Sequence, residues 1–121
     1  MILELLSLKK GEKLMSNKDF DVSIENIEKE VLNWQSSTFP NATKQAIFDK
    51  LHEEVGELYQ ETFLLHSKTA EEIADVAIVS ISLLNRMGTS LSAVIAAKLA
   101  INKDRTWGAE TENGDRPRVR A

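Results

Sequence analysis

Two groups of acidic residues in this chain have the spacing of a metal site. The first is Glu53, Glu54 and Glu57, and the second is Glu72 and Asp75. Residues three apart lie on the same side of a helix, so each group contains a pair that can share one ion. Carboxylate oxygens are the ligands that hard ions such as Mg²⁺ and Mn²⁺ prefer. The candidate metal ligands are therefore Glu54, Glu57, Glu72 and Asp75.

These candidate ligands border the apolar sides of their helices. At about 100° per residue, Glu54 lies about 60° from Leu51, at the edge of an apolar stripe. That stripe consists of Ile47, Leu51, Val55 and Leu58. On the next helix, Asp75 begins a side that continues with Val79 and Ser82. A carboxylate in such a place is costly unless a cation, a donor or a raised pKa compensates it. We therefore expect the ligands to point inward.

Each acidic group also has an ordinary structural interpretation. Glu53 and Glu57 would suit a solvated helix face, and Glu53 lies farthest toward solvent. Glu72 follows Thr69 by three residues, which is the spacing of a capping box. The two groups together, with Asp75 leading into a buried helix, favour the metal site over these alternatives.

A basic stripe follows at Lys98, Asn102 and Arg105. The same helical side is apolar at its start, at Leu91 and Val94, and becomes cationic without changing direction. Basic residues near a helix C-terminus also complement the helix dipole, but this does not explain their shared face. Facing inward, Lys98 and Arg105 would bind phosphate oxygens, and Asn102 would bridge a phosphate or a sugar.

Several side chains could contact a base or a sugar. Trp34, Phe39 and Trp107 offer aromatic rings for stacking, although Trp34 also continues the apolar stripe of its helix and would suit the core. Ser37 and Thr38 could donate hydrogen bonds.

Four helices are predicted to carry these residues, and no strand pattern is present. Apolar residues recur at three- and four-residue steps, with capping or breaking residues at the ends. The predicted ranges are 23–35, 43–65, 69–87 and 90–106, with a break at 36–42. Short connections between these helices indicate an all-α, four-helix bundle-like fold.

The third predicted helix is apolar nearly all round between residues 76 and 84. Such a helix is buried on most sides, and in a small domain other chains would supply part of the cover. We therefore expect contact with other chains along this helix. The predicted organisation is an N-terminal extension at 1–20 that fits either a helix or a strand, one all-α domain at 21–107, and an irregular tail at 108–121.

The composition excludes several classes of protein. The chain has 121 residues, as for one domain, and its net charge of −4 argues against a nucleic-acid partner. It has no cysteine, and hence no disulfide, thiolate zinc site or cysteine nucleophile. No apolar stretch is long enough to span a membrane, and Lys9 and Lys10 follow the leucine-rich start, the wrong order for a secretory signal. We expect a soluble, cytoplasmic protein.

Three segments together resemble one known family. They are Glu-Glu-Val-Gly-Glu at 53–57, Glu-Ile-Ala-Asp-Val at 72–76, and Lys98-x-x-x-Asn102-Lys103-x-Arg105-x-Trp107. As a set they are similar to the MazG-like all-α nucleoside triphosphate pyrophosphohydrolases. The Ala-Ile-Asn-Lys-Asp-Arg-Thr-Trp ending and the segment from Trp34 to Phe39 most resemble the dATP/dGTP diphosphohydrolase branch, which is common in phages and prophages. The resemblance covers about residues 24–120.

The resemblance implies a reaction, a set of roles and a helical bundle that assembles as a homodimer or homotetramer. The family cleaves a (d)NTP between the α and β phosphates, so dGTP or dATP is the expected substrate, and a phage setting in the host cytoplasm would link the reaction to the nucleotide pool. The four candidate ligands match the family's Mg²⁺ ligands, with about two or three ions per site and Mn²⁺ as a substitute. Glu53 or Glu57 would accept the proton of the attacking water. Lys98, Asn102 and Arg105 match the phosphate-side residues.

A second interpretation belongs to another class of protein. In a non-catalytic helical interaction module, the acidic faces would be exposed and the stripe from Lys98 to Arg105 would bind a partner protein.

Overall fold

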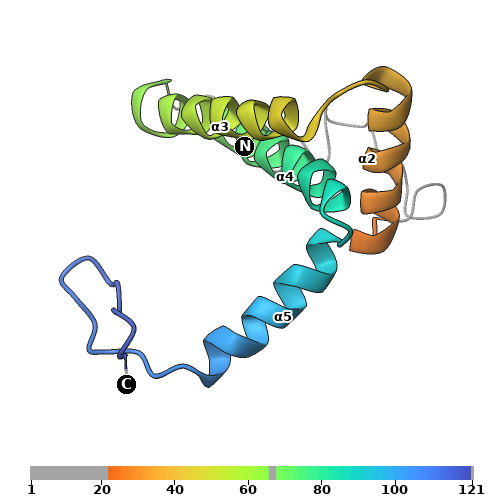
Figure 1. The fold of residues 1–121 in the computed structure, drawn as a ribbon. Helices are drawn as coiled ribbons and strands as arrows, with labels where there is room; N and C mark the ends of the chain where they lie inside the picture. Colours follow the sequence, from red (N-terminus) through yellow and green to blue (C-terminus); the bar gives the residue numbers. More distant parts are fainter. Residues whose placement is uncertain (1–21, 66–67, 121) are drawn as a thin grey trace, which may run out of the picture. The chain divides into compact units, whose positions relative to one another are not determined.

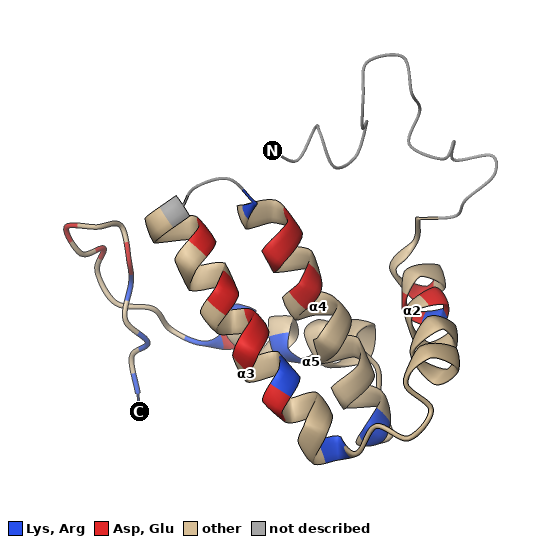
Figure 2. Ribbon diagram, turned by 90° about the horizontal axis from the view of Figure 1, so that it is seen from above, with Lys and Arg blue, Asp and Glu red and all other residues tan. Residues whose placement is uncertain are grey.

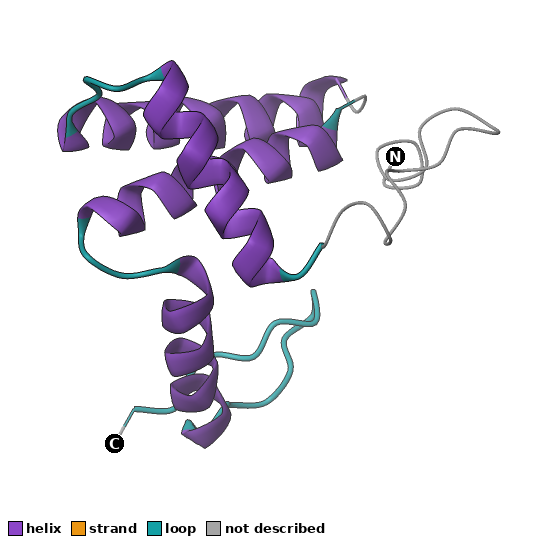
Figure 3. Cartoon of the chain, turned by 90° about the vertical axis from the view of Figure 1, so that its right-hand side faces the viewer, coloured by secondary structure: helices purple, strands orange, loops and turns teal. Residues whose placement is uncertain are grey.

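The described part of the chain is built from helices and contains no strand (Figure 3). This computed structural model describes residues 22–65 and 68–120, so the predicted extension at 1–20 lies outside the described residues. The elements are α2 (Ile24–Thr38), α3 (Lys44–Gln60), the π-helix η1 (Glu61–Leu65), α4 (Thr69–Arg86) and α5 (Leu91–Asp104) (Figure 1). The prediction of an all-α fold with four main helices is confirmed.

Side-chain caps begin the first two helices. Ser23 Oγ accepts a hydrogen bond from the backbone N–H of Asn26 at 3.3 Å, as expected for the predicted cap of α2. Thr43 Oγ1 accepts one from the N–H of Ala46 at 3.1 Å and so caps α3. Each cap satisfies an N–H that the first turn of a helix leaves without a partner.

α4 begins without such a cap. Lys68 is its N-cap residue and makes no side-chain capping hydrogen bond. The capping box that Thr69 and Glu72 could have formed is therefore absent, because the helix starts at Thr69 rather than after it. The Glu72 carboxylate is consequently available for other interactions.

α2 continues through residues that were expected to break it. The helix runs to Thr38, whereas the sequence predicted a break beginning at residue 36. The hydroxyls of Ser36 and Ser37 donate to the carbonyls of Leu32 and Asn33, at 2.9 Å each, one turn back along the helix. Serine satisfied in this way is tolerated inside a helix, so the chain turns only at Phe39.

α4 is the central element of the first compact unit, which ends at Leu91. α3 packs along α4, and α2 crosses it (Figures 1 and 3). Residues 76–84 of α4 are buried or half-buried throughout, as their apolar composition predicted. The core consists of Ile47 from α3 with Val79 and Ile81 from α4.

The packed faces of α2 and α3 agree with the predicted ones only in part. Glu54 is 5% exposed and points inward as predicted, but Val55, which was placed in the apolar stripe of α3, is 50% exposed. On α2, Trp34 is 51% exposed, so its interpretation as a core residue is wrong, and Glu28 is buried instead. Apolar periodicity alone misplaced Val55 and Trp34 because the buried faces of both helices include carboxylates.

A side chain closes the connection between α3 and α4. α3 passes into η1, and the Glu61 carboxylate accepts a hydrogen bond from the backbone N–H of Lys68 at 3.0 Å. This contact ties the end of one helix to the start of the next. The two helices therefore run side by side in opposite directions. At the other end of α4, Gly88 adopts a φ of 81°, which suits the stop predicted there.

The second unit contains α5 and the C-terminal tail. The described tail, residues 108–120, has no helix or extended strand and is tied back to the end of α5. An isolated β-bridge joins Trp107 and Arg118, and Arg116 Nε donates to the carbonyl of Gly108 at 2.6 Å. Among the described residues, no single helix has the length and apolar composition to cross a membrane, although α4 and α5 taken together reach these limits as a broken pair.

Candidate metal centre

Three carboxylates from α3 and α4 come together in the first unit. One oxygen each of Glu54, Glu57 and Glu72 lies within 4.8 Å of the others. Figure 2 shows acidic residues on neighbouring turns of the two helices. Ligand oxygens on opposite sides of Mg²⁺ stand about 4.2 Å apart, so small side-chain movements would let these three share an ion. The antiparallel packing thus brings together residues that the sequence separates by a turn.

Two oxygens of this cluster are buried without a partner. Neither Glu54 Oε2 nor Glu72 Oε2 accepts a hydrogen bond within the described part of the chain. A buried charged oxygen that has lost its water is costly unless a cation or a donor replaces that water. These oxygens and the all-carboxylate ligand set fit a hard divalent cation.

The carboxylates disturb one another's protonation. The nearby Glu54 charge is the main reason why the pKa of Glu57 is raised, with burial adding to it. Burial raises the pKa of Glu72, and the charges of Asp75 and Glu54 raise it further. Burial likewise raises the pKa of Asp75, followed by the Glu54 charge. The cluster therefore holds more negative charge than its surroundings compensate.

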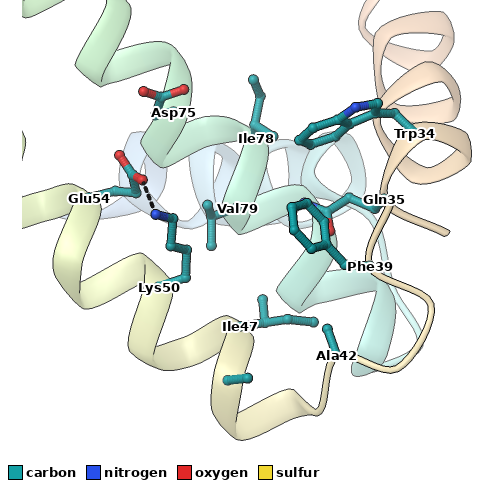
Figure 4. Close-up of a pocket in the computed structure, with 11 residues that line it drawn as sticks. Trp34, Gln35, Phe39, Ala42, Ile47, Lys50, Glu54, Asp75, Ile78 and Val79 are labelled. Atoms are coloured by element: carbon teal, nitrogen blue, oxygen red, sulfur yellow. Dashed lines mark ion pairs between the residues drawn. The ribbon is translucent and has the colours of Figure 1, made fainter. Parts of the chain in front are cut away.

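Asp75 and Glu53 lie at different depths beside this cluster. Asp75 is half-buried on α4 and faces the same cavity as Glu54 (Figure 4). It is not among the three residues whose oxygens lie within 4.8 Å of one another, so its part as a ligand remains a prediction. Glu53 is exposed, and its Oε1 lies 3.6 Å from Lys50 Nζ. Its catalytic role is likewise a prediction.

Lys50 is a site residue that the sequence reasoning missed. Its ammonium lies 3.1 Å from Glu54 Oε1, on the same helix and one turn earlier (Figure 4). The hydrogen bond to Glu54 is the main reason why the pKa of Lys50 is raised. The signal was present in the sequence, because residues four apart on a helix are neighbours.

An apolar cavity of about 390 Å³ adjoins the acidic cluster. Figure 4 shows Glu54, Lys50 and Asp75 at one end and an aromatic pair, Trp34 and Phe39, at the other. The two rings meet edge to face with centroids 5.6 Å apart. The wall between the ends is aliphatic and includes Ile47, Ile78 and Val79. Pockets of this size and composition hold small organic ligands.

The aromatic end contains one polar residue that sequence reasoning did not single out. Gln35 lines both this cavity and a smaller one of about 140 Å³ that also contains Phe39 and Arg86. Ser37 and Thr38, which were predicted to contact a sugar or a base, line neither cavity. The Ser37 hydroxyl is bonded to the Asn33 carbonyl.

The predicted phosphate-binding residues form a group of their own in the second unit. Arg105 donates to Asn102 Oδ1 at 3.1 Å, and the Trp107 indole N–H donates to the Asn102 carbonyl at 2.9 Å. Asn102 thus holds both neighbours at the end of α5. Lys98 lies one turn earlier and is exposed. Their binding of phosphate remains a prediction.

The fold and the acidic cluster define the class of this protein as MazG-like and all-α. The structure resembles that of the cyanophage S-2L MazG-like pyrophosphohydrolase bound to dGDP and three catalytic Mn²⁺ ions per active site. The TM-score is 0.65 and the sequence identity 30%, covering 84% of this chain and 97% of that one.

The chain belongs to the dATP/dGTP pyrophosphohydrolase family, whose sequence profile matches residues 27–121. It is 33% identical over 85 residues to the dATP/dGTP diphosphohydrolase of Salmonella phage PMBT28, and this match spans only 28% of that protein. It is 32% identical over 92 residues to the dATP/dGTP diphosphohydrolase of cyanophage S-2L, spanning 84% of it. The resemblance found in the sequence is confirmed.

The raised pKa values predict how the stability of the metal-free protein depends on pH. The ordinary pKa values are 4.5 for Glu and 3.8 for Asp, and those of Glu72 and Asp75 are raised in the folded protein. At pH values between the ordinary and the raised pKa, the folded state holds protons that the unfolded chain has released. Rising pH therefore removes stability through this window. Substituting Glu72→Gln removes one such group. In EDTA at neutral pH, we expect this variant to melt a few degrees above the wild type.

The difference should shrink as the pH falls through the window, and thermal unfolding followed by fluorescence at several pH values measures it. Added Mn²⁺ should reverse the order of the two melting temperatures at neutral pH, because the wild type binds the ion better than Glu72→Gln does. The carboxylate ligands are deprotonated at this pH, as metal binding requires. If the wild type is more stable than Glu72→Gln in EDTA at neutral pH, the negative charge of this cluster is not uncompensated.

Proposed function

We propose that this protein hydrolyses a deoxynucleoside triphosphate, dGTP or dATP, to the monophosphate and pyrophosphate. The observation that carries the proposal is the convergence of Glu54, Glu57 and Glu72 within 4.8 Å, beside a cavity of nucleoside size. The names of the two phage relatives support the choice of dATP or dGTP. In a phage-encoded protein, the reaction would reshape the nucleotide pool of the host cytoplasm.

Divalent ions supply the chemistry that side chains alone do not. When bound, about two or three Mg²⁺ ions would activate a water for attack on the α-phosphorus and neutralise the leaving pyrophosphate. The three Mn²⁺ ions of the cyanophage structure support this number. Glu54, Glu57, Glu72 and Asp75 would hold the ions.

The side chains of this protein would bind, orient and accept a proton. Glu57 would accept the proton of the attacking water, because its carboxylate lies in the cluster that would hold the ions. Glu53, which is exposed on the same turn, is the alternative acceptor of this proton and would release it to solvent. Neither role requires a covalent intermediate.

The cavity suggests how the nucleotide would lie. Its charged end holds Glu54 and Asp75, so the triphosphate and its ions would occupy that end. The base would then reach the aromatic end, where Trp34 and Phe39 offer ring faces and edges. Gln35 lies beside them, and its amide could both donate to and accept from the edge of a base.

The group at the end of α5 would bind phosphate. Arg105 and Lys98 carry charges that match phosphate oxygens, and Asn102 already orients the guanidinium of Arg105. Trp107, held by the carbonyl of Asn102, offers a further ring for a base or a sugar. Ser37 and Thr38 would act at the sugar, after a change of hydroxyl rotamer in the case of Ser37.

An exposed apolar stripe supports a homodimer or homotetramer. Four residues on one side of α3 and η1 are each at least half-exposed: Phe48, Val55, Tyr59 and Phe63. The rings of Tyr59 and Phe63 are 5.0 Å apart and extend the stripe into η1. A continuous apolar surface of this kind marks a protein interface. We expect a second copy of the chain to cover this stripe, as the apolar composition of α4 also favours.

Removal of one ligand tests the metal assignment. We expect Asp75→Asn to lower the rate of pyrophosphate release from dGTP and dATP in Mg²⁺ by more than the roughly 10- to 100-fold that outer partners of a metal site cost. Asp49→Asn is the matched control, since Asp49 lies on the surface of α3 and accepts a hydrogen bond from Gln45. It should retain wild-type activity.

Unchanged activity in Asp75→Asn would reject its role as a ligand. If the wild type hydrolyses no member of a full dNTP and NTP panel in Mg²⁺ or Mn²⁺, yet binds a partner protein through α5, the interaction-module interpretation replaces the enzyme.

Truncation of an aromatic ring tests the position of the base. Because stacking on an aromatic side chain contributes about 1–3 kcal/mol per base, Phe39→Ala should raise the KM for dGTP by roughly 5- to 150-fold with a smaller change in kcat. Phe39→Tyr keeps the ring and should restore the KM. A KM that Phe39→Ala leaves unchanged would place the base outside this cavity.

A charge placed in the apolar stripe tests the oligomer. We expect Tyr59→Glu to lower the mass measured by light scattering during gel filtration, because a charge in an apolar interface loses its water without gaining a partner. Gln60→Glu adds the same charge on the next residue, off the stripe, and should leave the mass unchanged. Equal masses for both variants would show that the interface lies elsewhere.

A further inference from the structure

We propose that Lys50 is an exchangeable counter-ion of the metal centre. In the metal-free protein its ammonium holds Glu54, and when a divalent ion binds, the ammonium is displaced into the cavity, where it binds a phosphate of the substrate. The second half of this proposal rests on the proposed function, whereas the first half requires only that the cluster binds metal.

The ammonium of Lys50 lies beside a carboxylate that would hold a metal ion. Its Nζ lies 3.1 Å from Glu54 Oε1 and 3.6 Å from Glu53 Oε1. Glu54 is 5% exposed, and its other oxygen has no hydrogen-bond partner in the described ranges. The ammonium therefore forms an ion pair with Glu54, the most buried carboxylate in the cluster. Its charge also reaches Asp75, whose pKa it lowers against the raising effect of burial.

This contact is more than an ordinary surface ion pair. Pairs between residues four apart stabilise helices best when the acid precedes the base, and here Lys50 precedes Glu54. A surface pair also leaves both groups hydrated, whereas Glu54 has lost almost all contact with solvent. The ammonium thus replaces the water that burial has removed from Glu54 Oε1.

A divalent ion on Glu54 would repel the ammonium of Lys50. An ion bound at Glu54 Oε2, the oxygen without a partner in the described residues, would place two positive charges beside the ammonium on Oε1 and so weaken the ion pair. The Lys50 side chain is about half-exposed (51%) and has a flexible four-carbon stem, so it can leave by rotamer changes alone. The backbone of α3 need not move.

The cavity determines where the displaced charge would go. Lys50 lines the charged end of the cavity together with Glu54 and Asp75, and the remaining walls are largely apolar (Figure 4). An ammonium released at this end of the cavity would attract an anion that enters it. In the proposed reaction, that anion is a phosphate of the nucleotide. Binding of metal and substrate would therefore be linked through one side chain.

The first experiment measures metal affinity without nucleotide. In Lys50→Met, Mn²⁺ no longer competes with the ammonium, so titration followed by electron paramagnetic resonance should show affinity tightened by about two- to fivefold, the range for a weak ion pair. Lys44→Met removes the same charge from the same helix, roughly 9 Å away along its axis, and should leave the affinity unchanged. In EDTA, Lys50→Met should also melt below the wild type.

Lys50→Gln provides a polar replacement if the methionine variant fails to fold. The counter-ion proposal is overturned if the Mn²⁺ affinity is unchanged or weakened in both Lys50→Gln and Lys50→Met while Lys44→Met keeps the wild-type affinity.

The second experiment separates the counter-ion from the proposed function. Lys50→Met should raise the KM for dGTP more than it lowers kcat, and Lys50→Arg should retain most of the wild-type KM. If the wild type hydrolyses no nucleotide but the shift in Mn²⁺ affinity occurs, the proposed function fails and the counter-ion stands. If the wild type is active and the KM of Lys50→Met is normal, the displacement onto phosphate is wrong.

Discussion

Negative charge buried between α3 and α4 is the constraint on which the rest of this structure depends. Glu54 and Glu72 each hold an oxygen that is buried and without a partner in the described residues, and Glu57 stands within reach of both. Such an arrangement opposes folding, because like charges repel and lost water is not replaced. A protein keeps it when a ligand removes the penalty. The stability and the chemistry of this unit therefore have the same origin.

The constraint also explains the packing around the cluster. The face of α3 toward α4 alternates apolar and acidic residues, with Ile47 and Glu54 both buried, so the apolar core stays small. The cavity beside it changes from charged to aromatic along its length, from Asp75 to Trp34. A molecule that is anionic at one end and flat and apolar at the other matches this gradient. A nucleotide has that form, which is why the cavity and the cluster point to one substrate class.

Much of this could be predicted from the sequence, but not every face. The helices, the acidic groups and the family were identified correctly because periodicity and spacing are local properties. Glu54 is buried as expected, but Val55 was placed in the apolar stripe of α3 and is exposed, because an apolar stripe does not reveal which neighbour it meets. Lys50 was overlooked, since its importance comes from the burial of Glu54 and not from its own type. Gln35 was overlooked because only the crossing of α2 over α4 brings it to a cavity.

The sequence by itself determined which elements form and which side chains are available for chemistry. Helix periodicity and the caps at Ser23 and Thr43 depend on residues only a few positions apart. Tertiary structure decided which carboxylates meet, how deeply each is buried, and that an aromatic pair stands opposite them. These properties arise from the contact of α3 and α2 with α4, whose residues are distant in the chain. Burial and pKa depend on such contacts, and they are what turns an ordinary acidic pattern into a site.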